Sequence, residues 1–420
     1  MDEQIIREII INQKEESKEM LRGVIKRQIP DLSIYIRNPN ILTVMGIRRC
    51  GKSTLALCLV NNIKAAYVNF DDERLINITS DNLNTLLEII YSVYGNVDVF
   101  LFDEIESIKG WELFIRRLRN TKKIILTGSN SNLLSGELST HLTGRHIDFI
   151  LFPFSFSEFL EYNSFEIKND YSTFDRGLIL KYFNDYTSTG GFPECIIIDK
   201  KMVISIYNDI IQKDIINRYK IRKINDFKNL SRYIISNYSN EFSYSKLGNY
   251  FDIDIHTVIK YVNYLENSYL IFTIHKFSFK VKEQYKTSFK IYLIDTSISD
   301  LNGFLPTKSL GNRIENIVFI ELLRRKSNNF NNMEIFYYKN NNYEVDFLLY
   351  ENNTVKQLIN VTYVSDYESV NRREINSLLN AGKELNCNDL ILITMNLDKI
   401  IERDNFKIIA IPVWKWLLSI

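Results

Sequence analysis

Hydrophobic positions in the first 153 residues form short continuous runs that longer amphipathic stretches separate. The runs cover residues 41–45, 65–70, 98–103, 123–128 and 147–153. Mainly apolar runs of this length are typical of strands buried on both faces of a parallel sheet, and the intervening stretches are long enough for helices. The pattern therefore predicts an α/β fold, with a mainly parallel sheet and helices on both faces, preceded by a charged helix within the first 40 residues.

The pattern changes after residue 154 and divides the rest of the chain into three predicted parts. Residues 155–230 read as helical and would form a helical lid over a bound ligand. Residues 231–290 contain two short helices and an extended pair, the order of elements in a winged helix. Residues 291–420 return to mixed helices and strands. We therefore predict four domains, the first of which spans residues 1–154.

The predicted winged helix carries an excess of positive charge. Its helices would cover residues 244–251 and 256–266, with a turn at 252–254 between them. Residues 201–290 hold 15 Lys and Arg against eight Asp and Glu. A basic excess suits contacts with DNA phosphates, but winged helices also dock proteins. Double-stranded DNA and a protein both stay open as partners.

Composition limits the classes of protein that fit. The 420-residue chain has a formal net charge of +1 and lacks the run of about 18 apolar residues that a membrane span needs. Its N-terminus does not resemble a signal peptide, so we expect a cytoplasmic protein. The four cysteines have no Cys-x-x-Cys spacing and the four histidines have no metal-ligand spacing, so neither disulfides nor zinc are indicated.

A glycine-rich segment with the pattern G-x-x-x-x-G-K-S-T follows the first predicted strand and precedes a predicted helix. Its two glycines let consecutive backbone N–H groups surround a phosphate chain, and the helix directs its positive end toward it. This context favours a phosphate-binding loop over a simple glycine-rich turn. We predict that ATP contacts the loop residues Gly46, Ile47, Arg48, Arg49, Cys50, Gly51, Lys52, Ser53 and Thr54.

Three members of this loop have individual roles in the prediction. Lys52 would reach the β- and γ-phosphates, and the hydroxyl of Ser53 would ligate Mg²⁺. Cys50 is either a small residue that fits the loop or a reactive thiol. We expect alkylation of Cys50 to inactivate the protein and bound ATP to protect it.

The third predicted strand ends in two carboxylates, Asp103 and Glu104. Asp103 would hold Mg²⁺ together with Ser53, and Glu104 would polarise the water that attacks the γ-phosphate. Taken alone, two acids at a strand end would suggest solvated surface residues. The phosphate loop upstream favours the catalytic interpretation.

Two further polar positions complete the predicted site. Ser129 or Asn130, after the fourth predicted strand, would sense the γ-phosphate, although the same residues suit an ordinary turn. Arg145, before the fifth strand, would be an arginine finger that stabilises the charge of the transition state; a surface salt bridge is the alternative. The finger would come from the same chain or from a neighbouring copy, in which case the protein would be a homo-oligomer.

The chain resembles a family of prokaryotic AAA-type P-loop ATPases whose loop reads G-I-R-R-x-G-K-S-T and whose C-terminal half is a domain of unknown function. Further matching blocks lie at residues 69–74, 102–105, 126–129, 143–145, 152–159, 190–194, 315–319 and 344–347. The resemblance covers nearly the whole chain. It implies an ATPase that uses ATP and Mg²⁺, with a C-terminal domain similar to restriction endonucleases.

Nucleases of that fold hold metal through a helix glutamate, a strand aspartate and an E-x-K pair. Glu315 and Asp346 match the first two positions. Asn360 and Thr362 stand where the acid and the lysine of the pair are expected, and neither can replace them.

We therefore expect the C-terminal domain to be an inactive endonuclease-like fold, unless Lys339 or Lys356 supplies the missing lysine. The two matching acids would then be structural. Their expected ion-pair partners are Arg313, Arg372 or Arg373.

Together these patterns predict an Mg-dependent ATPase that acts as a molecular switch coupled to DNA or to a protein partner. One alternative is a nucleotide-gated DNA-binding or defence protein that hydrolyses ATP slowly, and another is an ATP-regulated nuclease. Saturable ATP turnover separates the first from the second, and metal-dependent nicking of DNA identifies the third.

Overall fold

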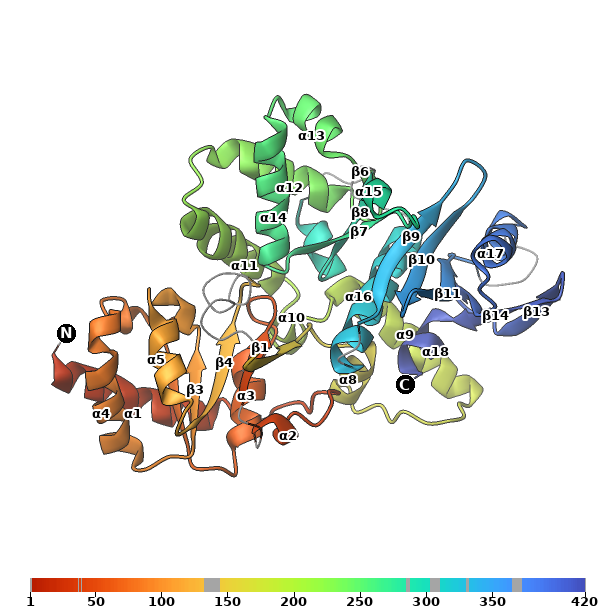
Figure 1. Ribbon diagram of the computed structural model, residues 1–420. Coiled ribbons are helices and arrows are strands. Elements are labelled where there is room, and N and C mark those ends of the chain that lie inside the picture. Colours follow the sequence, from red (N-terminus) through yellow and green to blue (C-terminus); the bar gives the residue numbers. More distant parts are fainter. Residues whose placement is uncertain are drawn as a thin grey trace. The chain divides into compact units, whose positions relative to one another are not determined.

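The chain folds into two compact units, shown in the computed structural model of Figure 1. Unit 1 comprises Met1–Pro153 and Asn267–Tyr269, and unit 2 comprises Phe154–Glu266 and Leu270–Ile420. The structure describes residues 2–36, 38, 40–131, 144–284, 288–302, 310–329, 332–364 and 372–419. Unit 1 thus includes three residues that lie far along the chain from the rest of it.

Unit 1 is built on a five-stranded parallel sheet with the order β2-β3-β4-β1-β5. Its strands are β1 (Ile41–Met45), β2 (Ala65–Asn69), β3 (Val99–Asp103), β4 (Lys123–Gly128) and β5 (His146–Ile150). The strands β1 and β3 are buried along their whole length, because helices cover both faces of the sheet. The predicted α/β class with a parallel sheet is confirmed.

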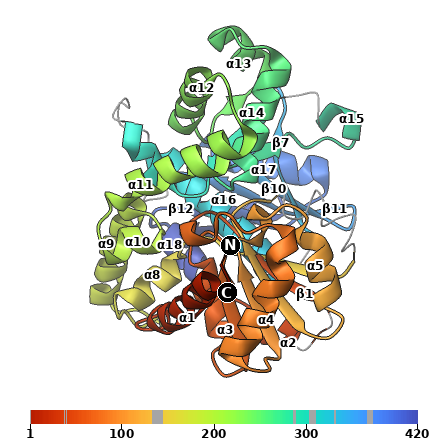
Figure 2. The ribbon, with the colours of Figure 1, turned by 90° about the vertical axis from the view of Figure 1, so that its left-hand side faces the viewer.

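The helices of unit 1 follow from the order of the strands. They are α1 (Glu3–Glu19), α2 (Ser33–Ile36), α3 (Lys52–Val60), α4 (Leu83–Tyr94) and α5 (Trp111–Leu118). The chain crosses from β1 to the edge strand β2 and returns through β3 to β4. Because such crossovers are right-handed, α3 covers one face and α4 and α5 the other (Figure 1). The helix α1 packs on α4 and on β2 (Figure 2).

Unit 2 begins with a helical part. Its helices are α8 (Phe156–Tyr162), α9 (Thr173–Thr189), α10 (Pro193–Ile197), α11 (Met202–Asp209) and α12 (Ile224–Ser236), and a π-helical segment, Ile210–Asn217, continues α11. Ser155 and Glu158 form a reciprocal capping box at the start of α8, and Ser172 and Asp175 do the same for α9. These caps fix where both helices begin.

A small antiparallel sheet with the order β6-β8-β7 follows the helical part. Its strands are β6 (Glu241–Phe242), β7 (Ile271–His275) and β8 (Phe289–Leu293), and its helices are α13 (Tyr244–Phe251), α14 (Ile255–Asn267) and α15 (Val281–Gln284). Ser243 accepts a hydrogen bond from the backbone of Lys246 and caps α13. Both helices of the predicted helix-turn-helix pair are therefore present.

The C-terminal part of unit 2 is a six-stranded mixed sheet with the order β13-β14-β12-β11-β10-β9. Its strands are β9 (Glu334–Lys339), β10 (Glu344–Glu351), β11 (Thr354–Val361), β12 (Leu390–Thr394), β13 (Lys399–Arg403) and β14 (Phe406–Pro412). Its helices are α16 (Leu310–Asn329), α17 (Arg372–Leu385) and α18 (Val413–Leu418). The helix α17 and the central strands enclose a shared apolar core. Among the described residues, no helix is both long and apolar enough to cross a membrane.

Candidate nucleotide-binding site

The predicted phosphate loop lies between β1 and α3, so a buried strand leads into it and a helix begins at Lys52. Gly46 has a φ of 147°, and a Cβ atom there would lie 2.1 Å from the backbone oxygen of Leu151. Gly51 has a φ of 97° and precedes the helix directly. Both positions require glycine, and the loop directs the N-terminal end of α3 toward its own concave side.

Lys52 is buried at the start of α3, with 5% of its side chain exposed. Its Nζ atom donates a hydrogen bond of 3.1 Å to the backbone oxygen of Ile47 and lies 3.7 Å from Oε1 of Glu104. Burial alone would lower the pKa of Lys52, but Cys50, Glu104 and Asp103 together raise it above its usual value. Lys52 therefore stays positively charged near neutral pH.

Asp103, at the end of β3, is buried and bonded on several sides. The Tyr67 hydroxyl donates to its Oδ2 atom at 3.0 Å, the Thr127 hydroxyl donates to its Oδ1 atom, and Ser53 shares a side-chain hydrogen bond with it. Burial raises the pKa of this carboxyl group, and the neighbouring charge of Glu104 adds to the effect. The structure brings Ser53 and Asp103, the two predicted Mg²⁺ ligands, into contact.

Glu104 follows Asp103 with a φ of 55°, a left-handed backbone that is uncommon for a glutamate. Its Oε2 atom accepts hydrogen bonds from the backbone N–H and the hydroxyl of Ser129, at 3.2 and 3.1 Å. Burial would raise the pKa of Glu104, but the charges of Lys52 and Arg48 outweigh it and the pKa is lowered. The carboxylate is therefore ionised and held beside the phosphate loop.

The two predicted sensor residues, Ser129 and Asn130, are both fully buried after β4. Ser129 touches Glu104, so it belongs to the site.

The predicted arginine finger, Arg145, is exposed next to β5, where its backbone oxygen accepts a hydrogen bond from the backbone N–H of Ile41. Among the described residues, no hydrogen bond or ion pair joins the Arg145 guanidinium to the residues of the loop, and residues 132–143 just before it lie outside the described part. Its role as an arginine finger stays a prediction.

Three residues make contacts at this site that the sequence analysis did not predict. Arg27 donates to the backbone oxygens of Cys50 and Phe152, at 3.0 and 2.6 Å, and thereby ties the loop to the segment after β5. Arg48 pairs with Asp71 at 2.9 Å. Tyr67, from the edge strand β2, orients Asp103. No spacing rule predicts the first two contacts, whereas the position of Tyr67 within a predicted strand beside β3 was a usable signal.

Cys50 does not behave as the sequence suggested. Its side chain is fully buried, and its Sγ atom donates to the backbone oxygen of Leu151 at 3.4 Å. Burial raises the pKa of the thiol, so the reactive thiolate is scarce near neutral pH. Rapid alkylation is therefore no longer expected at Cys50; the exposed thiol among the described cysteines is Cys58.

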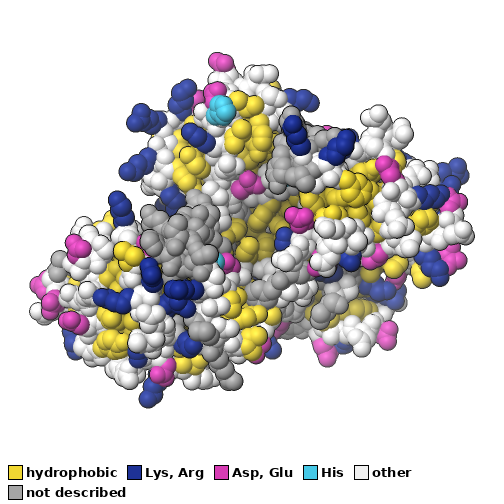
Figure 3. Space-filling model, viewed as in Figure 1, with side chains coloured by type: hydrophobic (Ala, Val, Ile, Leu, Met, Phe, Trp, Pro, Cys, Tyr) yellow, Lys and Arg dark blue, Asp and Glu magenta, His cyan; other side chains and the backbone are white. Residues whose placement is uncertain are grey.

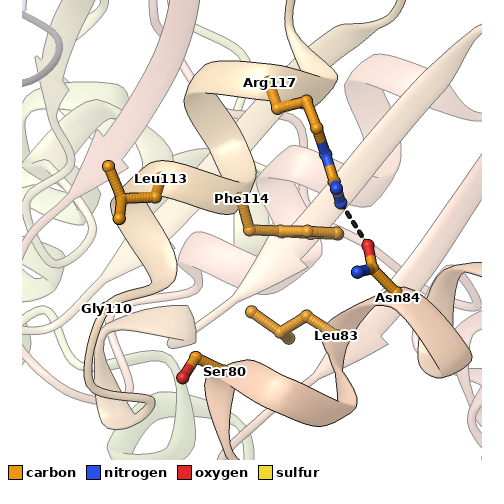
Figure 4. A pocket seen from close by; sticks show the side chains of 7 residues that line it. All are labelled: Ser80, Leu83, Asn84, Gly110, Leu113, Phe114 and Arg117. Carbon is orange, nitrogen blue, oxygen red and sulfur yellow. Dashed lines mark hydrogen bonds between the residues drawn. The ribbon is translucent and has the colours of Figure 1, made fainter.

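A separate hollow of about 270 Å³ lies between the start of α4 and α5 (Figure 4). The ring of Phe114 and the side chain of Leu83 face it, and Arg117 reaches across to donate a hydrogen bond to Asn84. None of its lining residues belongs to the phosphate loop or to the acidic end of β3. The hollow is therefore distinct from the candidate nucleotide site.

The second candidate centre lies in unit 2, where the structure corrects the expected ion pairs. Lys290, on β8, places its Nζ atom 3.3 Å from Glu315, 2.8 Å from Glu344 and 3.5 Å from Asp346. The Tyr292 hydroxyl also donates to Glu315, at 2.8 Å. The partner of the two acids is thus a lysine that the sequence interpretation did not consider.

The expected arginine partners have other positions. Arg313 pairs with Asp300, and Arg372 and Arg373 are exposed at the start of α17. Of the two lysines considered as replacements, Lys339 pairs with Glu344 at 3.2 Å and Lys356 is exposed. The expectation that an arginine neutralises Glu315 and Asp346 is wrong, because β8 delivers Lys290 to the same place.

Asn360 holds the strand side of this centre together. Its side chain accepts a hydrogen bond from the backbone of Asp346 at 3.1 Å and donates to Glu374 at 2.8 Å. Burial raises the pKa of Glu315 to about 7 and that of Glu374 to about 7. Across the described residues, no group of three or more His, Cys, Asp and Glu side chains is arranged to hold a metal ion.

The parallel sheet, the phosphate loop after β1 and the carboxylates after β3 give unit 1 a fold like that of AAA-type P-loop ATPases. Residues 38–160 match the family described as the AAA domain. Residues 180–303 and 310–416 match two families described as domains of unknown function, DUF8612 and DUF4143.

The chain belongs to the same family as the uncharacterized protein MJ1544 of Methanocaldococcus jannaschii. The two are 37% identical over 99% of this chain and 95% of that protein. An uncharacterized protein of Haemophilus influenzae is 30% identical over 68% of this chain and 74% of its own length. The family therefore extends over both units.

Solved structures give weaker matches. The Walker-type ATPase paby2304 of Pyrococcus abyssi is 14% identical, covers 70% of this chain and 95% of its own, and has a TM-score of 0.43. Cdc6p from Pyrobaculum aerophilum is 13% identical, covers 71% of this chain and 97% of its own, and has a TM-score of 0.28. Scores this low carry no weight, so the class rests on the site and on the family matches.

Proposed function

We propose that this protein binds Mg-ATP in unit 1, hydrolyses it, and acts as a molecular switch. The observation that carries the proposal is the meeting of four side chains at one end of the sheet. Lys52 lies 3.7 Å from Glu104, and Ser53 is bonded to Asp103. A cation for phosphate, a pair of oxygen ligands for Mg²⁺ and an ionised carboxylate for water are the parts that phosphoryl transfer to water needs.

Each residue has one task in this proposal. The loop amides and Lys52 bind the β- and γ-phosphates, and Ser53 and Asp103 hold the metal. Oxygen ligands of this kind suit Mg²⁺, which neutralises charge on the phosphates when it is bound. Glu104 accepts the proton of the attacking water, because its lowered pKa keeps it ionised. Ser129 orients Glu104, and Arg145 completes the site as the arginine finger.

For unit 2 we propose that residues 155–230 form a lid, residues 231–290 a winged helix and residues 291–420 an inactive endonuclease-like domain. The order α12, β6, α13, α14, β7, β8 supports the winged helix. Lys and Arg side chains gather over α11–α14 (Figure 3). Lys246 and Lys260 are exposed there, which supports duplex DNA as the partner that the switch responds to; a protein partner is the alternative.

The test is steady-state ATP hydrolysis by the purified protein with Mg²⁺, with and without duplex DNA. Wild-type protein should show saturable turnover. The matched variant Glu104→Gln keeps the shape of the side chain but removes the base, so it should bind ATP normally and lose kcat by about 10²–10³-fold. Wild-type turnover by Glu104→Gln would refute the assignment of the base.

DNA dependence decides the partner. Stimulation of turnover by duplex DNA, lost in the double variant Lys246→Ala and Lys260→Ala, would support the winged helix as the DNA-binding surface. Turnover that ignores DNA would point to a protein partner. ATP binding without turnover would instead favour a nucleotide-gated binder that hydrolyses slowly.

A further inference from the structure

The three residues Asn267–Tyr269 belong to unit 1, although the chain on either side of them belongs to unit 2. They join the end of α14 to the start of β7. Ser268 is 1% exposed and Tyr269 is 4% exposed, so these two residues are buried and do not form a solvated linker.

The first contact of this segment is with the chain that leaves β4. The backbone N–H of Ser131 donates to the oxygen of Asn267 at 2.9 Å, and the Ser131 hydroxyl donates to Oδ1 of Asn267 at 3.0 Å. Ser131 lies two residues beyond Ser129, whose hydroxyl and backbone N–H both bond to Glu104. Asn267 thus fixes the segment that orients Glu104.

The second contact is with the strand that enters the phosphate loop. The Tyr269 hydroxyl donates to the sulfur of Met45 at 3.6 Å, and Met45 directly precedes Gly46. Burial raises the pKa of Tyr269, and the neighbouring charges of Asp148, Cys50 and Glu106 raise it further. The contact with Met45 places the Tyr269 hydroxyl beside the strand that enters the loop.

The backbone of Tyr269 is strained. Its φ is 59°, a left-handed value that bulky aromatic residues rarely adopt. Such a conformation persists only where the surroundings determine it completely. A relaxed connection between α14 and β7 would not need it, so the strain indicates that the position of the ring in unit 1 matters more than an easy path for the chain.

We propose that Asn267 and Tyr269 are positioning residues of the nucleotide site: Asn267 sets the orientation of Glu104 through Ser131 and Ser129, and Tyr269 holds the strand that enters the phosphate loop. Because the chain joins both residues directly to α14 and β7, a change in those elements alters turnover of nucleotide. This inference rests on the proposed ATPase function and adds the regulation of its site.

The first experiment compares Asn267→Ala, Asn267→Asp and the exposed α13 control Asn249→Ala in full-length protein. Asn267→Ala removes the hydrogen bond from the Ser131 hydroxyl and keeps the one to the Asn267 backbone oxygen. This loss should lower kcat by about fivefold and leave the affinity for ATP unchanged. Asn267→Asp keeps the Oδ1 acceptor and should restore kcat, whereas Asn249→Ala should match wild type. Equal kcat in Asn267→Ala and wild type would overturn the role of Asn267.

The second experiment does not depend on turnover. Cys50 is buried in the loop that follows Met45, the residue that Tyr269 contacts, and the variant Cys58→Ser removes the exposed thiol. In that background, Tyr269→Ala should speed alkylation of Cys50 by about tenfold, because the emptied space lets the loop open, and Tyr269→Phe should not. Peptide-level mass spectrometry measures the rate; unchanged labelling in Tyr269→Ala would overturn the role of Tyr269.

The two experiments separate this inference from the proposed function. If wild type hydrolyses ATP and the Asn267 variants behave like it, the inference fails and the ATPase assignment stands. If wild type does not hydrolyse ATP, the ATPase assignment fails, and the labelling of Cys50 still decides whether Tyr269 holds the loop.

Discussion

Each unit contains one buried lysine that faces carboxylates, and the two lysines are equally hidden, with 5% of each side chain exposed. Lys290 in unit 2 lies within 3.5 Å of three carboxylates. Lys52 in unit 1 donates to a backbone oxygen, and its nearest described carboxylate is 3.7 Å away. The backbones that carry the two lysines also differ. The site around Lys52 contains glycines with positive φ and a left-handed Glu104, whereas Lys290 lies within the strand β8.

This difference separates a lysine that holds a fold together from one that is ready for a ligand. Charges buried in a protein interior are stabilised only when partners satisfy them. Lys290 has those partners, so its removal should damage the structure. Lys52 has fewer of them, so phosphate oxygens can complete its surroundings. The centre around Lys290 has more acidic residues, yet the centre around Lys52 is the better candidate for binding a ligand.

The largest effect should follow from Lys290→Ala. The change leaves Glu315, Glu344 and Asp346 partly buried near one another without their shared cation, which should lower the free energy of unfolding of unit 2 by about 3 kcal/mol. Urea unfolding followed by tryptophan fluorescence measures this. The control Lys339→Ala removes a more exposed lysine that also pairs with Glu344 and should cost far less. Equal losses of unfolding free energy in the two variants would mean that Lys290 has no special role in the stability of unit 2.

The matching change in unit 1 is Lys52→Ala. We expect a loss of ATP affinity of about 100-fold, close to 2.7 kcal/mol, with little change in the stability of unit 1. Isothermal titration with Mg-ATP measures the affinity, and Lys64→Ala, at an exposed position outside the loop, is the control. If Lys52→Ala unfolds unit 1, Lys52 is a structural residue like Lys290, and the proposed difference between the two lysines is wrong.

The pH dependence of unit 2 sharpens the comparison. The folded-state pKa of Glu315 is raised to about 7, above its ordinary value, so ionising it opposes folding. Wild type should therefore lose stability as the pH rises from 5 to 8, and Glu315→Gln should remove about 2 kcal/mol of that loss. Unfolding at both pH values tests this, with the exposed Glu334→Gln as control. Part of the slope should remain in Glu315→Gln, because the pKa of Glu374 is also raised to about 7. A slope that is undiminished in Glu315→Gln would assign the titration to Glu374 or another group.

The smallest predicted effect concerns Tyr67. Tyr67→Phe removes one hydrogen bond to Asp103, so the carboxylate should orient less well, and the Mg²⁺ concentration for half-maximal turnover should rise by about fivefold, close to 1 kcal/mol. Tyr94→Phe is the matched control, because the Tyr94 hydroxyl bonds to the backbone of Tyr67 and not to Asp103. An equal shift in both variants would show a general loosening of β2.

The sequence was sufficient for the sheet of unit 1 and for the phosphate loop, since buried parallel strands appear as mainly apolar runs and the loop needs glycines at fixed spacing. It was not sufficient for Lys290. That lysine lies 25 residues before Glu315 and on a different sheet from Asp346, so only the folded chain brings them together. Asn267 and Tyr269 were hidden for the same reason, because no local pattern shows that a distant segment packs beside the loop.

Each unit contains at least one buried cysteine, so thiol labelling can measure how often that unit opens. Cys50 lies in unit 1, and Cys195 and Cys387 lie in unit 2; all three thiols are buried, at 0%, 2% and 3% exposure. A thiol of this kind reacts with a labelling reagent only while its surroundings are transiently open. Labelling rates under native conditions therefore report the opening free energy of each unit separately, without denaturant and without any engineered cysteine.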